Sequence, residues 1–185
     1  ENVFWSQKRY NELIQQIALE RNGWQRLQEA RDLAEEGTPQ KFAEAIVLAR
    51  KIDPQLFARA KAEKEIEGWS RTLLAMATKR LGAKDLPGAI EAAAVVPQDS
   101  PLFAEAQDLM QLGRAQAVTW NQSISTPLAQ HIFNLLEGQG AASQIAPGRP
   151  LYQQAQTQIE NLQVQFQDLL RLQMASTINF LSMAK

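Results

Sequence analysis

The chain has 185 residues, of which 45% are hydrophobic and 21% charged, and its formal net charge is −1. This balance lacks the excess of lysine and arginine that marks nucleic-acid-binding proteins, so we expect no nucleic-acid partner. The sequence contains no cysteine, which excludes a disulfide framework and thiolate chemistry.

The sequence begins ENVFWSQKRY, without an initiator Met or the layout of a signal peptide, and it ends inside an apolar pattern. We therefore expect a fragment of a longer chain. No apolar run approaches the roughly 18 to 20 residues that a membrane-spanning helix needs. A cytoplasmic location is favoured, with a membrane tether on a segment outside this sequence as the alternative.

The N-terminal segment 2–24 predicts an amphipathic helix with large apolar side chains. The terminal unit of a repeat array normally has a polar outer surface, so exposed aromatic residues at an end predict a partner. We expect Phe4 and Trp5 at this end, and Phe180 at the other end, to face neighbouring units of a longer chain, a second copy of the chain or a different protein. The apolar residues of the first segment are Val3, Phe4, Trp5, Leu13, Ile14, Ile17 and Trp24.

Three nearly identical phrases, PQLFARAK, SPLFAEAQ and RPLYQQAQ, recur along the chain. Their aromatic residues, Phe57, Phe103 and Tyr152, are 46 and 49 residues apart, and each is followed three positions later by alanine. Trp24 recurs as Trp69, 45 residues later. Anchors that share a period of about 45 residues predict stacked structural units. We take these five aromatic residues as the structural anchors of the repeat and expect the rings of Phe57, Phe103 and Tyr152 to be buried between units.

Each unit predicts a long helix followed by a short one. Asp53 and Ser100 are expected as N-caps, with Pro54 and Pro101 as first helical residues, because proline has no N–H to lose there. Apolar residues then recur at spacings of three and four, which is helical periodicity.

The ends of the helices are predicted from glycine and proline. Gly82 is expected to end the long helix of the second unit, and the segment 88–96 (GAIEAAAVV) to form a short buried helix. In the third unit we expect Thr126 and Pro127 to start a new helix or kink the old one. The segment 137–143 (EGQGAAS) is expected to form a loop that replaces part of the short helix.

These patterns together predict an all-α fold of stacked long-plus-short helical hairpins. We expect an α-solenoid with a repeat of about 45 residues, arranged as a single array over residues 1–185. Its units are expected at roughly 1–53, 54–100, 101–149 and 150–185.

The repeated pattern stands as Ala89-Ile90, Val96, Ser100–Phe103 and Ala106, and again as Ile145, Pro150–Tyr152, Ala155 and Ile159. It resembles the degenerate helical repeat of cyanobacterial proteins often labelled as chromosome-segregation-ATPase-like or tetratricopeptide-like. The resemblance covers roughly residues 24–172 and implies a helical-repeat architecture. No G-x-x-x-x-G-K-[ST] loop is present, so an ATPase activity has no support. The period also departs from the 34 residues of tetratricopeptide repeats.

No group of residues predicts catalysis, cofactor binding or a metal site. The only histidine, His131, has no second histidine or cysteine to share a metal with, and we expect it at the edge of an apolar helix face. Glu63 and Glu67 share a helix face with Lys61 and Lys64, which predicts a salt-bridged surface rather than a carboxylate pair.

We therefore expect a non-enzymatic scaffold or adaptor that binds other proteins. The alternative is a membrane-surface module in which amphipathic helices, such as residues 2–20, lie on lipid. Direct membrane contact is not favoured, because the polar faces mix acidic, amide and basic residues and the net charge is not positive.

Overall fold

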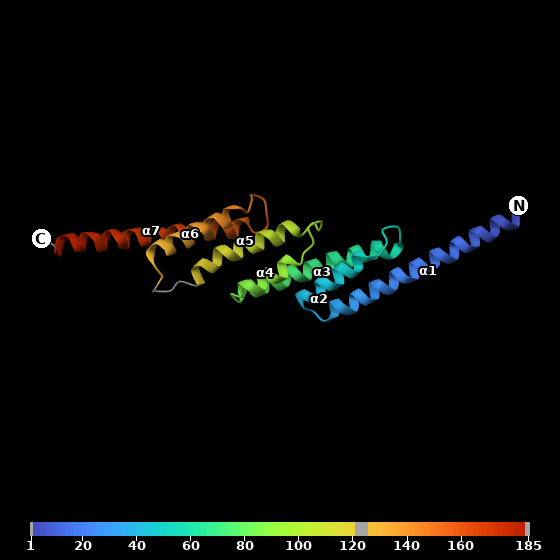
Figure 1. Cartoon of the computed structure of the whole chain (residues 1–185). Helices are drawn as coiled ribbons and strands as arrows, with labels where there is room; N and C mark the ends of the chain where they lie inside the picture. The colour runs from blue at the N-terminus through green and yellow to red at the C-terminus, as the bar shows by residue number, and fades with distance from the viewer. Residues whose placement is uncertain (1, 121–125, 184–185) are drawn as a thin grey trace. The chain divides into compact units, whose positions relative to one another are not determined.

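The computed structural model describes the backbone of residues 2–120 and 126–183, and the side chains of residues 6–120 and 126–175. The expected all-α fold is confirmed for these residues, which contain no strand. The described helices are α1 (Asn2–Glu35), α2 (Pro39–Arg50), α3 (Phe57–Gly82), α4 (Leu86–Ala94), α5 (Phe103–Trp120), α6 (Leu128–Ser143) and α7 (Tyr152–Met183) (Figure 1).

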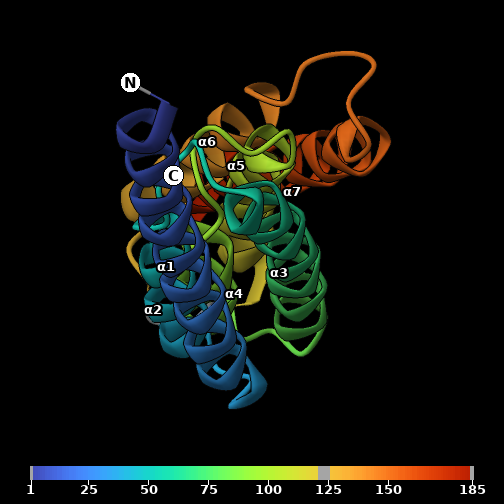
Figure 2. The ribbon, with the colours of Figure 1, turned by 90° about the vertical axis from the view of Figure 1, so that its right-hand side faces the viewer.

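The chain forms two compact units, each with its own contacts. The first unit is Glu1–Ala75 with Val95–Ser100, and the second is Met76–Ala94 with Pro101–Lys185. In the first, α1 and α2 lie side by side (Figure 1 and Figure 2). In the second, α5 packs on α4, α6 and α7, and α6 packs on α7. Within each unit the packed pairs are therefore mainly helices that follow one another in the chain, which is consistent with stacked hairpins.

The start of α2 is capped by a side chain, whereas α3 and α5 start without the N-caps that the sequence predicts. At the start of α2, Thr38 is the N-cap, because its hydroxyl accepts a hydrogen bond from the Lys41 N–H at 3.3 Å, and Pro39 is the first helical residue. The N-caps expected at Asp53 and Ser100 are wrong, since both residues lie three or more positions before the helices begin.

Asp53 makes a turn before α3 instead of capping it. Its carboxylate accepts a hydrogen bond from the Gln55 N–H at 2.9 Å, and its carbonyl accepts one from the Leu56 N–H at 3.1 Å. The side chain is thus bonded two residues along, an Asx-type turn that competes with helix. In each of the three phrases the helix begins at the aromatic residue, Phe57, Phe103 or Tyr152.

The end of α3 also differs from the prediction. Gly82 is the last helical residue, but the left-handed residue that stops the helix is Lys84, with φ of 62°. The Asp85 N–H then donates to the Arg80 carbonyl at 2.9 Å, which is the six-to-one bond of a Schellman end. At the end of α1 the left-handed residue is Gly37, with φ of 69°, where glycine carries no steric penalty.

The loop expected at 137–143 is wrong, because these residues are the last turns of α6. Gly138 is there for packing: a Cβ on it would lie 2.9 Å from the Val118 Cγ2 and 3.2 Å from the Leu162 Cδ1. The glycine thus lets α6 approach α5 and α7 closely. The new helix expected after Thr126 and Pro127 is confirmed, since α6 begins at Leu128.

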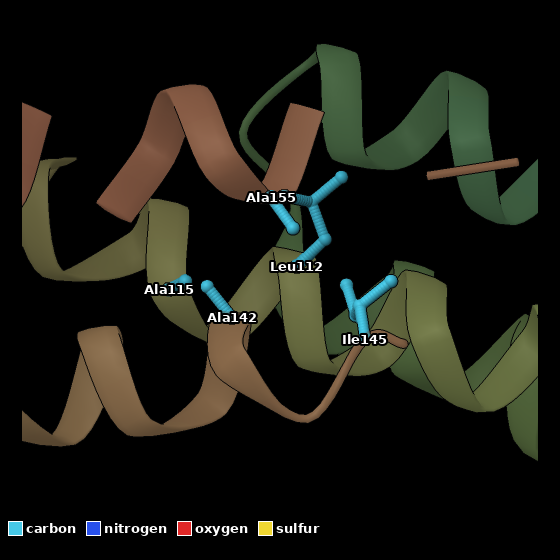
Figure 3. Close-up of a cluster of buried hydrophobic side chains, with 5 residues drawn as sticks. All are labelled: Leu112, Ala115, Ala142, Ile145 and Ala155. Carbon is cyan, nitrogen blue, oxygen red and sulfur yellow. The ribbon is translucent and has the colours of Figure 1, made fainter. Parts of the chain in front are cut away.

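The second unit has a core built largely from small residues at the meeting of α5, α6 and α7 (Figure 3). Alanines at this point let the helix backbones come close, and two larger side chains fill the space between them. Tyr152 packs against the edge of this cluster. Its buried members are Leu112, Ala115, Ala142, Ile145 and Ala155.

The core of the first unit follows the same logic. Leu27 and Ala30 of α1 and Ala45 of α2 are fully buried. In the first two turns of α3 the buried residues are Ala58 and Ala62, not Ala60 as the repeat predicts, so the covered face of the helix is shifted.

Candidate interaction surface

The first half of α1 is exposed over a longer stretch than any other described helix. All described residues from Ser6 to Leu19 are exposed, and burial begins at Gly23. From there α1 packs on α2, whereas its N-terminal half extends beyond the end of α2 (Figure 1). A helical segment without tertiary contacts is only marginally stable on its own, so this one needs a reason to remain helical.

The exposed half of α1 carries a row of large apolar side chains that we call the α1 stripe. Its members are spaced three, one, three and seven residues apart, which places them on one face of the helix. The stripe ends where the buried face begins, since Leu27 is fully buried. The α1 stripe consists of Tyr10 (61% exposed), Leu13 (55%), Ile14 (47%), Ile17 (55%) and Trp24 (45%).

Charged residues border the α1 stripe. Arg9 and Glu20 lie along the same border, eleven residues or about three helical turns apart. Glu20 is held in place, because its Oε1 accepts a hydrogen bond from the Phe57 N–H at 2.8 Å, while its Oε2 is buried with no hydrogen-bond partner in the described part of the chain. Lys8 forms an exposed pair with Glu12 at 4.0 Å.

The five expected anchors have unlike environments. Trp69 is buried, and Phe103 and Tyr152 are partly buried. Trp24 is 45% exposed and Phe57 is 79% exposed. The expectation of a buried ring is therefore wrong for Phe57. The physical reason at Phe57 is the rotation of α3, which buries the adjacent Ala58 and thereby directs Phe57 outward.

Three residues expected to face a partner cannot be placed at side-chain level. Phe4 and Trp5 lie in α1 and Phe180 lies in α7, but their side chains fall outside the described residues. The candidate surface therefore rests on the α1 stripe.

The acidic cluster expected on α3 is a salt-bridged surface, as predicted, although with partly different partners. Glu63 pairs with Arg59 at 3.1 Å, and Glu67 pairs with Arg71. Glu65 receives Arg31 of α1 at 2.9 Å and also pairs with Lys61. These contacts join α1 to α3.

Glu65 has a lowered pKa. Burial favours its neutral form, but the hydrogen bonds from Arg31 and Lys61 and the charges of the same two residues outweigh burial and hold the pKa below its ordinary value. The carboxylate is therefore ionised at neutral pH and has a structural role.

His131 is partly buried, as expected of a residue at the edge of an apolar face. Its Nε2 is buried without a hydrogen-bond partner among the described residues. Over the same residues no group of three or more His, Cys, Asp or Glu side chains converges in a way that could hold a metal ion.

One polar hollow lies between α5 and α6. It has a volume of about 420 Å³ and is lined by Arg114, Glu137, Gln111 and Gln144, with Gly140 among the small residues of its wall. The Gln111 Nε2 donates to the Gln144 Oε1 at 2.8 Å across one end. Since no nucleophile or convergent carboxylate pair lines it, the hollow offers no catalytic arrangement.

Sequence reasoning missed a partly buried ion pair in the second unit. The Arg149 Nε donates to the Asp108 Oδ2 at 2.7 Å, and only 9% of the Asp108 side chain is exposed. The pair joins the loop before α7 to α5. Its only sequence signal is the arginine that begins the third repeated phrase and an aspartate shortly after the second aromatic residue.

Two further findings bear on classification. No helix in the described residues is long and apolar enough to cross a membrane. No family model, curated protein sequence or solved structure matches the chain.

Proposed function

We propose that this chain is a non-enzymatic scaffold that binds protein through exposed helix surfaces. The packing of consecutive helices in each unit supports a helical-repeat architecture, and an α-solenoid is the arrangement that the repeated phrases favour. The resemblance to cyanobacterial degenerate helical-repeat proteins leads to the same proposal. A scaffold needs only a stable frame and an exposed apolar surface, and both are available here.

The observation that carries this proposal is the α1 stripe. Five large apolar side chains, each about half exposed, lie on one face of α1, and all of them except Trp24 lie on the segment 6–19, where every residue is exposed. Contiguous exposed apolar surface of this kind marks interaction sites in soluble proteins. Its ordinary occupant is an amphipathic helix, which contributes side chains at the same spacing.

Capture from lysate by the immobilised chain, compared with matched variants, tests this function. Leu13→Lys with Ile17→Lys places two charges in the α1 stripe, whereas Leu172→Lys with Met174→Lys places the same charges on exposed positions of α7. We expect the first variant alone to lose the captured proteins. Equal capture by both variants and the wild-type chain would remove the α1 stripe as the binding surface.

Vesicle co-sedimentation separates the scaffold from the membrane-surface alternative. Vesicles containing anionic lipid should not carry the wild-type chain to the pellet if the α1 stripe binds protein. Sedimentation that depends on Leu13 and Ile17 would instead support a lipid-facing helix.

A further inference from the structure

We propose that the polar hollow between α5 and α6 binds a small zwitterion, a free amino acid with a polar uncharged side chain, which is a function beyond scaffolding. The hollow lies within the second unit, and its volume of about 420 Å³ falls in the range of roughly 300 to 1,000 Å³ found for ligand sites in proteins. One cationic, one anionic and two amide side chains line it, together with small residues of α6. A ligand that carries both charges and an amide is complementary to these groups.

Two contacts between the helices show how α5 and α6 run along the polar hollow. At one end the Gln111 Nε2 donates to the Gln144 Oε1 at 2.8 Å. Further along, Val118 of α5 lies beside Gly138 of α6. Residue numbers therefore rise along α5 as they fall along α6, so the two helices are antiparallel and the lining residues between these contacts face one another.

The polar hollow holds a positive and a negative side chain about one helical turn apart. Arg114 comes four residues before Val118 on α5, and Glu137 lies level with Val118 on α6, so the two positions are about 6 Å apart along the helices. Neither Arg114 nor Glu137 has an ion pair or hydrogen bond with a residue that the structure describes. An α-amino acid has its carboxylate and ammonium on one carbon atom, and charge-assisted hydrogen bonds of about 3 Å to Arg114 and Glu137 span this distance.

The pair of glutamines at the end of the polar hollow selects the side chain of the ligand. Their mutual hydrogen bond uses the nitrogen of Gln111 and the oxygen of Gln144. It leaves the Gln111 Oε1 as an acceptor and the second N–H bonds of the Gln144 Nε2 as donors. A carboxamide offers the complementary donor and acceptor, so L-glutamine carries all three groups that the hollow fits.

Gly140 indicates that the ligand approaches the backbone of α6 closely. A Cβ on Gly140 would meet no atom of the described residues within 4 Å, so packing does not require glycine there, unlike at Gly138. Glycine is also a poor helix former compared with alanine, yet Gly140 lies within α6. Glycine is used where a backbone must approach a ligand, and Gly140 lies in the wall of the polar hollow.

Titration of the isotope-labelled chain with L-glutamine, followed by NMR, tests the site. We expect saturable shifts of the side-chain amide signals of Gln111 and Gln144 and of the Gly140 N–H, with a dissociation constant on the order of 1 mM for so small a ligand. Glutaramate, which lacks the ammonium group, and 4-aminobutanamide, which lacks the carboxylate, should each bind at least about tenfold more weakly. The absence of saturable shifts, or equal shifts with inorganic sulfate, overturns the inference.

Matched variants assign the contacts within the polar hollow. Glu137→Gln should weaken L-glutamine binding at least about tenfold and leave glutaramate binding unchanged, whereas Glu160→Gln, at an exposed position of α7, should bind like the wild-type chain. Gly140→Ala should weaken binding, whereas Gly68→Ala, at a helical glycine of α3 with equal free space, should not. Circular dichroism should show both alanine variants fully helical. Unchanged L-glutamine binding by Glu137→Gln or by Gly140→Ala overturns the inference.

Discussion

The starts of α3 and α7 are built from nearly the same phrase, yet they have different environments. Tyr152, the first residue of α7, packs against the buried cluster around Leu112, and Ala155 three positions later is fully buried. Phe57, the first residue of α3, is 79% exposed, and Ala60 is exposed as well. The phrase therefore determines where a helix begins and leaves open which of its faces is covered.

The difference arises from the neighbours of each helix. At α7, helices α5 and α6 lie on the side of Tyr152 and Ala155. At the start of α3, the buried positions are Ala58 and Ala62, four residues apart, so the covered face is rotated relative to the phrase. Successive residues of a helix point about 100° apart. A shift of the covered face by one or two residues is therefore enough to move a ring from the core to solvent.

The largest expected effect is at the centre of the second unit. Leu112→Ala removes a side chain that is 1% exposed among closely packed alanines, so we expect a loss of about 3 kcal/mol in the free energy of unfolding. Urea unfolding followed by circular dichroism measures it. Leu136→Ala, at a position 52% exposed on α6, is the control and should change stability by less than about 0.5 kcal/mol. Equal effects would mean that the cluster does not hold this unit together.

The comparison of the two helix starts is tested directly by removing each ring. Tyr152→Ala should destabilise the chain by about 2 kcal/mol, less than for a fully buried aromatic residue because the ring is only partly covered. Phe57→Ala should stay within about 0.5 kcal/mol of the wild-type value. A large loss at Phe57 would show that its ring is covered in solution, for instance by a second copy.

A smaller effect is expected from the contact between α1 and α3. Glu65→Gln removes the charge that Arg31 and Lys61 hold, and should cost about 0.5 to 1 kcal/mol near neutral pH. Because the folded-state pKa of Glu65 is lowered, this stabilisation is present above the ordinary pKa of the carboxyl group. It is lost as the pH falls through the lowered value. The urea midpoints of the two proteins should therefore converge in acid, and a constant difference across pH would exclude the charge as its cause.

The sequence could predict what depends on local chemistry. The start of α2 at Thr38 and Pro39, the short helix around 88–96 and the all-α content follow from capping, periodicity and composition. Contacts with other helices could not be read from it. Gly138 was expected in a loop because its role is to make room for Val118, which lies on another helix and leaves no local signal. The exposure of Phe57 likewise depends on which side of α3 is covered.

The candidate surface was predictable in part for the same reason. The apolar residues Leu13, Ile14, Ile17 and Trp24 could be placed on one helix from their spacing. Their exposure could not, because for Leu13, Ile14 and Ile17 it depends on α1 extending beyond the end of α2 (Figure 1). The contact of Glu20 with the start of α3 joins residues 37 positions apart and has no local signal.

The smallest expected effect compares the ends of α1 and α3. Both end in a left-handed residue, Gly37 with φ of 69° and Lys84 with φ of 62°. A side chain in this conformation costs about 1 to 2 kcal/mol, part of which glycine would give back through the entropy of the unfolded chain. Lys84→Gly should therefore stabilise the chain by about 0.5 kcal/mol, measured as a higher urea midpoint.

Two controls separate backbone strain from loss of the lysine charge. Lys84→Ala removes the charge and keeps the left-handed strain, so it should give no gain in stability. Gly37→Ala introduces the same strain at the end of α1 and should lower stability by about 1 kcal/mol. If Lys84→Ala stabilises the chain as much as Lys84→Gly, the lysine side chain and not its φ is unfavourable. The two helix ends would then share a left-handed residue but not its energetic cost, just as the two helix starts share a phrase but not an environment.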